Sequence, residues 1–341
     1  MDQQAPAILV MAAGRGTRMK SEKPKVLHPL MGKPLVEHVL NAALYLAPAK
    51  VVVITGFGAE AVEEDITAFM GAIRERRGGE AVPEPVFARQ TEQLGTGHAV
   101  AMAKEALSGF SGPVVIMSGD VPLISPNTLD GFLKAHQALE ADLSVLTVRL
   151  EDPAAYGRII RDPNGWLERI VEYRDADEEQ RRIEEINSGL YVARSDLLYE
   201  SIDRLSPNND QKEYYLTDVV ADFRSRGLRA AAVEIPEALA YEVRGINDRY
   251  ELAATQAIVK DRINESWMRA GVTMLDPLST YIEGGVKLAP DVMLWPGVIL
   301  TGRTVVKAGA EIGPYCQLHD CRVAEGLKIA GHQCLRGQKL E

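Results

Sequence analysis

Short apolar runs alternate with amphipathic segments through about residue 245. The runs AILVMAA, VVVITG, PVFAR and PVVIMSGD are separated by stretches with helical spacing, such as LVEHVLNAALYL and EAVEEDITAFMGAI. Continuous apolar strands between helices are typical of βαβ units, whose parallel sheet is covered on both faces. The pattern therefore predicts an α/β domain built on a Rossmann-like, doubly wound and mostly parallel sheet.

A different period governs the C-terminal part of the chain. One column of small or apolar residues occupies every sixth position from Val286 to Cys316, and a second runs from Leu288 to Leu318, with Gly and Pro recurring at the corners. This spacing indicates the hexapeptide repeat of a parallel β-helix. Antiparallel strands would also alternate, but they would leave the phased turn residues unexplained. The repeat fades after Asp320.

The polar segment DRYELAATQAIVKDRINESWM joins the two patterns and contains no Gly or Pro. It predicts a helix whose first turn is capped by Asn247 or Asp248. We therefore expect an α/β domain over residues 1–247, a connecting helix over 248–268 and a short β-helix over 269–341.

Composition excludes several classes of function for this chain of 341 residues. The net charge of −10 disfavours general binding to nucleic acid or to an anionic membrane, so any anion site must be local. The N-terminal MDQQAPA lacks the basic and apolar regions of a signal peptide, which favours the cytoplasm. Cys316, Cys321 and Cys334 form no CxxC pair, and we expect them to be small apolar fillers.

The loop MAAGRGTRMKSEKPK, which follows the first apolar run, carries five cations in fifteen residues. It does not match the dinucleotide fingerprint or the P-loop, because Met19 stands where each requires glycine. Small residues at the carboxyl end of a strand let a ligand approach the backbone, and Arg18 and Lys25 could then reach its phosphates. Spacing alone leaves a nucleotide site and a solvated loop equally open.

The longer stretch LVMAAGRGTRMKSEKPKVLHPLMGKPLVEHV resembles the signature of sugar-1-phosphate nucleotidyltransferases. Its amino-acid sequence is similar to that of the uridyltransferase domain of the bifunctional N-acetylglucosamine-1-phosphate uridyltransferases and glucosamine-1-phosphate acetyltransferases. RQTEQLGTGHAV and VVIMSGDVPLI follow in that family's order, as do AAYGRII, RIVEYRDA, EEINSGLYV, QKEYYLTD and VRGINDRY. Ser118 departs from the family, which often has an aromatic residue there, and we expect looser packing near the ribose.

The resemblance implies a role for each matching residue. Arg18 and Lys25 would be catalytic, and Asp120 and Asn247 would hold Mg²⁺. The nucleotide would be bound by Met11, Ala12, Ala13, Gly14, Lys25, Gln90, Gly95, Thr96, Ser118, Gly119 and Asp120. The sugar phosphate would be bound by Gly157, Glu172, Asn187, Thr217 and Asn247.

The implied reaction transfers UMP from UTP to N-acetylglucosamine 1-phosphate, giving UDP-N-acetylglucosamine for cell-wall precursor synthesis, and pyrophosphate. Full-length relatives also carry a long left-handed β-helix that holds the acetyltransferase site and assembles trimers. Because this chain stops at Glu341, we expect neither acetyltransferase activity nor trimers. A nucleotidyltransferase with another nucleotide or hexose phosphate, and a non-catalytic nucleotide-sugar binding module, stay open as alternatives.

Overall fold

The computed structural model describes residues 4–77 and 82–341, which form two compact units. The first unit comprises residues up to 27 and 35–247, and the second comprises 28–34 and 248–341. The predictions made for the first residues of the chain fall partly on residues 1–3, outside the described part. In that part, no helix combines the length and the apolar character needed to cross a membrane.

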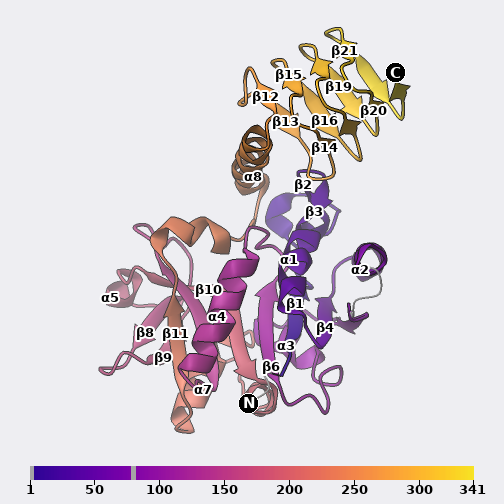
Figure 1. Ribbon diagram of the computed structural model, residues 1–341. Helices are drawn as coiled ribbons and strands as arrows, with labels where there is room; N and C mark the ends of the chain where they lie inside the picture. The colour runs from indigo at the N-terminus through magenta and orange to yellow at the C-terminus, as the bar shows by residue number, and fades with distance from the viewer. Residues whose placement is uncertain (1–3, 78–81) are drawn as a thin grey trace. The chain divides into compact units, whose positions relative to one another are not determined.

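A nine-stranded sheet forms the centre of the first unit (Figure 1). Its main path runs β11-β7-β10-β6-β1-β4-β5, and β8 and β9 extend it from β10. β10 is antiparallel to both β6 and β7, whereas the pairs β11–β7, β6–β1, β1–β4 and β4–β5 are parallel. The strands are β1 (Ala7–Ala12), β4 (Lys50–Thr55), β5 (Pro85–Arg89), β6 (Pro113–Ser118), β7 (Leu143–Arg149), β8 (Arg158–Arg161), β9 (Leu167–Val171), β10 (Glu185–Arg194) and β11 (Ala230–Glu234).

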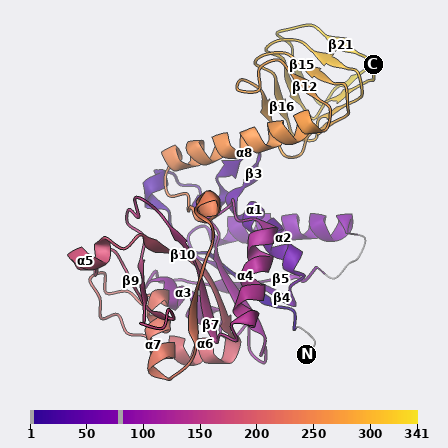
Figure 2. The same cartoon turned by 60° about the vertical axis from the view of Figure 1, so that its left-hand side comes forward.

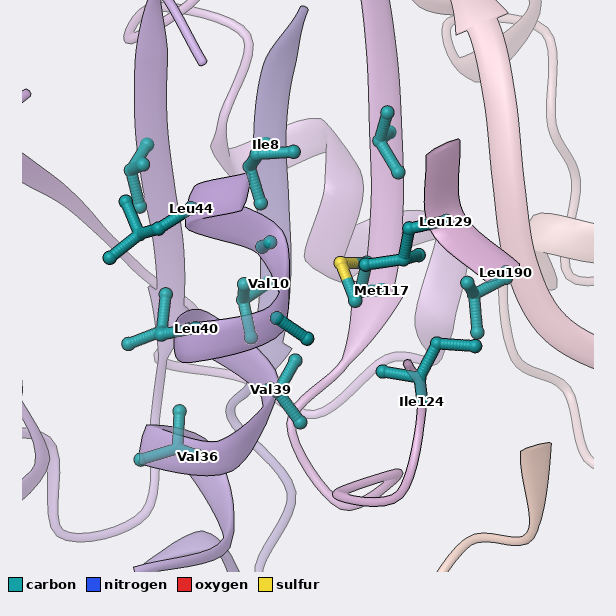
Figure 3. Close-up of a cluster of buried hydrophobic side chains, with 14 of the residues drawn as sticks. Ile8, Val10, Val36, Val39, Leu40, Leu44, Met117, Ile124, Leu129 and Leu190 are labelled. Carbon is teal, nitrogen blue, oxygen red and sulfur yellow. The ribbon is translucent and has the colours of Figure 1, made fainter. Parts of the chain in front are cut away.

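Helices cover both faces of this sheet (Figure 2). Alternate residues of β1 enter different cores: Ile8 and Val10 pack in one hydrophobic cluster, and Ala7 and Leu9 in the other. The first cluster takes side chains from α1 (Leu35–Ala43), α2 (Ala59–Arg76) and α4 (Pro126–Ala138), and Figure 3 shows part of it. The second takes side chains from α3 (Thr96–Met102), α6 (Ser195–Ile202) and α7 (Val219–Ser225). The short helix α5 (Glu178–Arg181) buries no residue. The predicted doubly wound α/β fold is therefore confirmed.

The second unit contains the hairpin β2 (Pro29–Leu30) and β3 (Lys33–Pro34), the helix α8 (Arg249–Arg269), and three stacks of short parallel strands. Asp248 caps α8 by accepting a 2.8 Å hydrogen bond from the Glu251 backbone N–H. The strands are β12 (Thr273–Met274), β13 (Tyr281–Ile282), β14 (Lys287–Leu288), β15 (Met293–Leu294), β16 (Ile299–Thr301), β17 (Val305–Val306), β18 (Glu311–Ile312), β19 (Gln317–His319), β20 (Arg322–Val323), β21 (Lys328–Ile329), β22 (Cys334–Arg336) and β23 (Lys339–Leu340).

The two columns predicted every six residues are buried along their whole length. Lys287 pairs with Val305 on the next coil, eighteen positions on, as three hexads require. From Val305 the partner is Arg322, only seventeen positions on, so one corner is a residue shorter. This deletion explains why the repeat fades in the sequence although the strands continue. The predicted short parallel β-helix is confirmed.

The three cysteines are free thiols, and they differ in environment. Cys316 and Cys321 are buried in the β-helix core. Cys334 is exposed, so its prediction as an apolar filler is wrong. The following residue on β22, Leu335, packs against the core instead, because neighbouring residues on a strand point to opposite sides.

Candidate functional site

The carboxyl ends of β1 and β6 bring the first loop together with Asp120. The two strands are parallel neighbours, and Met11 is the register partner of Ser118. The Gly119 backbone N–H continues this pairing beyond β6 by donating a 2.9 Å hydrogen bond to the Met11 carbonyl. Ligands of open α/β sheets bind at this edge, where adjacent parallel strands end together.

A cavity of about 260 Å³ opens beside these strand ends. Every residue predicted to bind the nucleotide lines it, except Gly119. A Cβ on Gly119 would lie 3.1 Å from Val26 and 3.2 Å from the Met11 carbonyl, so this glycine lets the loop pack closely.

The cavity is also lined by four residues that the sequence analysis did not single out, namely Val26, Gln93, Ala99 and Glu213. The Gln93 amide donates a 2.7 Å hydrogen bond to the Ala13 carbonyl, which joins the first loop to the segment RQTEQLGTGHAV. Gln93 lies within that quoted segment, so its position was a usable signal. Glu213 belongs to the segment QKEYYLTD, where nothing in the sequence marks it.

Two cations converge on one oxygen at the edge of the site. The Arg18 guanidinium and the Lys25 ammonium donate to Asn247 Oδ1 at 2.8 and 3.0 Å. Lys25 also forms an ion pair with Asp120. Because both cations donate to the same amide atom, that atom must be the oxygen, which fixes the orientation of the Asn247 side chain. Since Asp248 caps α8, Asn247 is not required as the cap.

Asp120 is held from its other side by Ser118. The Ser118 hydroxyl donates a 2.5 Å hydrogen bond to Asp120 Oδ1, while Lys25 occupies Oδ2. An aromatic residue, which the family often has at this position, carries no hydroxyl on its β-carbon and could not make the same bond. Ser118 thus orients a carboxylate, a contact that sequence reasoning missed.

The oxygens of Asp120 and Asn247 suit a hard divalent cation. Both lie within hydrogen-bond distance of the same Lys25 nitrogen, and Mg²⁺ prefers carboxylate, amide and phosphate oxygens. Over residues 4–77 and 82–341, no group of three or more His, Cys, Asp and Glu side chains could hold a metal. The arrangement fits a cation that takes two protein oxygens and completes its shell with phosphate and water.

Gly95, Thr96 and Gln90 form a further part of the cavity lining. Gly95 has a φ of +107°, and a Cβ there would lie 2.6 Å from the Tyr214 carbonyl. Thr96 begins α3, and its hydroxyl accepts a 3.0 Å hydrogen bond from the Leu216 backbone N–H. Gln90 is 5% exposed and follows β5. Its amide nitrogen lies 3.0 Å from the Gly95 carbonyl.

Four of the five predicted sugar-phosphate residues, Gly157, Glu172, Asn187 and Thr217, form a second group that does not line this cavity, whereas Asn247 lies with Arg18 and Lys25. The Asn187 backbone N–H donates to the Gly157 carbonyl at 2.9 Å, and the Asn187 amide donates to the Tyr191 hydroxyl at 2.8 Å. The Thr217 hydroxyl donates to Glu172 at 3.2 Å. Burial raises the pKa of Glu172 above its usual value, and the Thr217 bond only partly offsets this effect.

Tyr191 and Asp218 lie close enough to this group to share its electrostatics. Burial raises the pKa of the Tyr191 phenol, and the nearby Glu172 carboxylate raises it further. Burial also raises the pKa of Asp218. The group is therefore a desolvated set of hydrogen-bonding side chains with acidic members.

Residues 8–190 match the model of the MobA-like NTP transferase domain. "Bifunctional protein GlmU" of Syntrophotalea carbinolica is 42% identical over 335 residues, covering 98% of this chain and 68% of that protein. "Bifunctional protein GlmU" of Halalkalibacterium halodurans is 40% identical over 315 residues, covering 92% of this chain and 66% of that protein. The chain thus spans about two thirds of the length of these relatives.

Among solved structures, a UDP-glucose pyrophosphorylase complexed with UDP-glucose superposes with a TM-score of 0.61 at 20% sequence identity. The match covers 76% of this chain and 100% of that one. At this identity the likeness shows a shared fold.

Proposed function

This chain belongs to the GlmU family of sugar-1-phosphate nucleotidyltransferases, and on that premise we propose that it makes UDP-N-acetylglucosamine. The proposed substrates are UTP and N-acetylglucosamine 1-phosphate, and the second product is pyrophosphate. The observation that carries the proposal is the convergence of Lys25, Asp120 and Asn247 beside the cavity at the ends of β1 and β6. A cytoplasmic place in cell-wall precursor synthesis belongs to the same proposal.

The proposed reaction is an in-line displacement at phosphorus. A phosphate oxygen of the sugar 1-phosphate attacks the α-phosphorus of UTP, and the bond from that phosphorus to the oxygen bridging to the β-phosphorus breaks. The attacking phosphate is already ionised near neutral pH, so the step needs no general base. Catalysis then depends on positioning the two phosphates and neutralising their charge.

The cations of the site are suited to neutralising the charge of the two phosphates. Lys25 lies at the cavity wall, which supports the proposal that it contacts both phosphates as they approach. Arg18 donates to Asn247 Oδ1 from an exposed position. In the proposal it stabilises the departing pyrophosphate. Mg²⁺ bound through Asp120 and Asn247 would supply Lewis-acid neutralisation of the α-phosphate charge.

The second group supplies the acceptor pocket in this proposal. The backbone of Gly157 would lie against the sugar ring, and Glu172, Asn187 and Thr217 would bind its hydroxyl and N-acetyl groups. A Cβ on Gly157 would lie 3.1 Å from Ile170 and 3.5 Å from both Glu172 carboxylate oxygens, so any larger residue would crowd this surface.

The proposal is tested by pyrophosphate release with purified protein and a matrix of substrates. UTP, dTTP and CTP are each combined with N-acetylglucosamine 1-phosphate and with glucose 1-phosphate, in Mg²⁺ or in EDTA. We expect rapid release only from UTP with N-acetylglucosamine 1-phosphate in Mg²⁺. Release from another pair would overturn the substrate assignment, and no release from any pair would favour a binding module.

A further inference from the structure

The amide orientation of Gln90 follows from its hydrogen bonds. One amide atom lies 3.0 Å from the Gly95 carbonyl, which can only accept, so this atom is the nitrogen. The same nitrogen lies 3.1 Å from His98 Nδ1. Because an amide nitrogen only donates, His98 Nδ1 must accept, and the ring carries its proton on Nε2.

This pair of bonds uses both amide hydrogens of Gln90. Its backbone is also held, since the Gln90 N–H donates to the Thr55 carbonyl at 2.7 Å. Within the described part of the chain, no hydrogen bond uses Gln90 Oε1, and Gln90 lines the cavity. Both donors of the side chain are therefore used, and Oε1 is the atom left to accept a hydrogen bond from a ligand in the cavity.

An acceptor at this place distinguishes two kinds of pyrimidine. Uracil and thymine carry a hydrogen on ring nitrogen N3 and can donate it to Gln90 Oε1. Cytosine has a bare N3 that would face the same oxygen with a lone pair. Two acceptors hold the amide in this orientation, the Gly95 carbonyl and His98 Nδ1. A His98 that donated from Nδ1 would oppose this orientation and weaken the match to uracil.

We propose that His98 is a positioning residue that sets nucleobase choice by holding the Gln90 carbonyl toward the base. The inference rests on the proposed nucleotide site and adds a residue to it. His98 is positioned for this task by α3, which brings its Nδ1 to 3.1 Å from the Gln90 amide nitrogen. The pair selects uracil and thymine together, so it leaves the choice between them to other contacts.

The test compares two substitutions of similar shape. His98→Asn places a side-chain oxygen near the position of Nδ1 and keeps an acceptor there, whereas His98→Leu removes it. We expect the preference for UTP over CTP, measured as the ratio of kcat/KM values, to fall by about tenfold or more in His98→Leu. His98→Asn should keep most of the preference, and KM for N-acetylglucosamine 1-phosphate should change in neither. An unchanged preference in a folded His98→Leu variant overturns the proposal.

A second measurement holds even if His98→Leu does not fold. The ¹⁵N chemical shifts of the wild-type histidine rings, assigned by the signal lost in His98→Asn, should show His98 protonated on Nε2 alone. A proton on Nδ1 overturns the proposal. Calorimetric binding of UTP and CTP to wild type and both variants separates this result from the reaction. If the wild type binds UTP more tightly than CTP but does not turn it over, the proposed function is refuted. The role of His98 is then tested by whether His98→Leu loses this difference in affinity.

Discussion

Lys25 forms an ion pair with Asp120, 95 positions away in the sequence, and the same ammonium group hydrogen-bonds to Asn247. The lysine side chain is 12% exposed and the aspartate 18% exposed, so water screens the pair only partly. A cationic group is thus held where two oxygens converge at the mouth of the cavity.

Replacing Lys25 by glutamine should lower kcat by about 100-fold or more, because one preorganised charge is lost from the transition state. Initial rates at saturating UTP and sugar phosphate measure the effect. Lys23→Gln is the matched control, since Lys23 lies two positions earlier and is exposed. Equal rates for Lys25→Gln and Lys23→Gln would remove Lys25 from the mechanism.

Replacing Ser118 by alanine should weaken Mg²⁺ activation, because Asp120 then loses the hydroxyl that holds its Oδ1. Groups that orient a metal ligand commonly contribute about tenfold or more to metal affinity, and we expect a rise of about tenfold in half-saturating Mg²⁺. Titration of the initial rate with Mg²⁺ gives the value. Ser118→Thr keeps the hydroxyl and should stay near wild type, and a shift of equal size in both variants would contradict the account.

Replacing Gly95 by alanine should destabilise the protein and weaken UTP binding. The added Cβ would meet the Tyr214 carbonyl at 2.6 Å in a backbone conformation that side chains rarely adopt. Gly109→Ala is the control for backbone strain alone, because Gly109 has a φ of +72° and no atom within 4 Å of the added Cβ. The thermal midpoint should fall further for Gly95→Ala, and equal losses would show that the close approach is unimportant.

Glu172 should make the protein less stable as pH rises. Burial raises the folded-state pKa of this carboxyl above its ordinary value of 4.5, so the folded protein binds more protons than the unfolded chain above that pH. The free energy of unfolding therefore falls as pH rises from about 4.5 through the raised pKa.

Urea unfolding of wild type and Glu172→Gln from pH 4.5 to 7.5 isolates this contribution. The free energy of unfolding should fall less steeply with pH in the variant, because glutamine carries no proton to lose. Glu168→Gln, at an exposed position on β9, is the matched control and should follow wild type. Parallel curves for wild type and Glu172→Gln would show that the carboxyl is not desolvated.

Local sequence patterns predicted both folds because each depends on a short period. The run containing Ile8 and Val10 is apolar at every position, and this pattern indicates a strand that is buried on both faces of the sheet. The hexad from Val286 reports the β-helix core in the same way. The six-residue period did not predict the seventeen-residue coil, because one missing corner residue shifts every later core position, including Cys321.

The site was less predictable because its contacts join distant segments. Motif resemblance located Lys25, Asp120 and Asn247, whereas the bond from Gln93 to the Ala13 carbonyl spans 80 positions and leaves no local pattern. The bond from Ser118 to Asp120 is local, yet its direction depends on the rotamers that the fold imposes. Sequence therefore indicated which residues matter better than it indicated what they touch.

We propose that this chain joins UMP to a sugar 1-phosphate. The most direct measurement is ³¹P NMR of purified protein with UTP, N-acetylglucosamine 1-phosphate and Mg²⁺, followed to completion. The account predicts that the UTP and sugar-phosphate signals disappear together as UDP-N-acetylglucosamine and pyrophosphate appear in equal amounts, and that EDTA stops the change. Unchanged UTP, or its hydrolysis without a sugar nucleotide, would contradict the account.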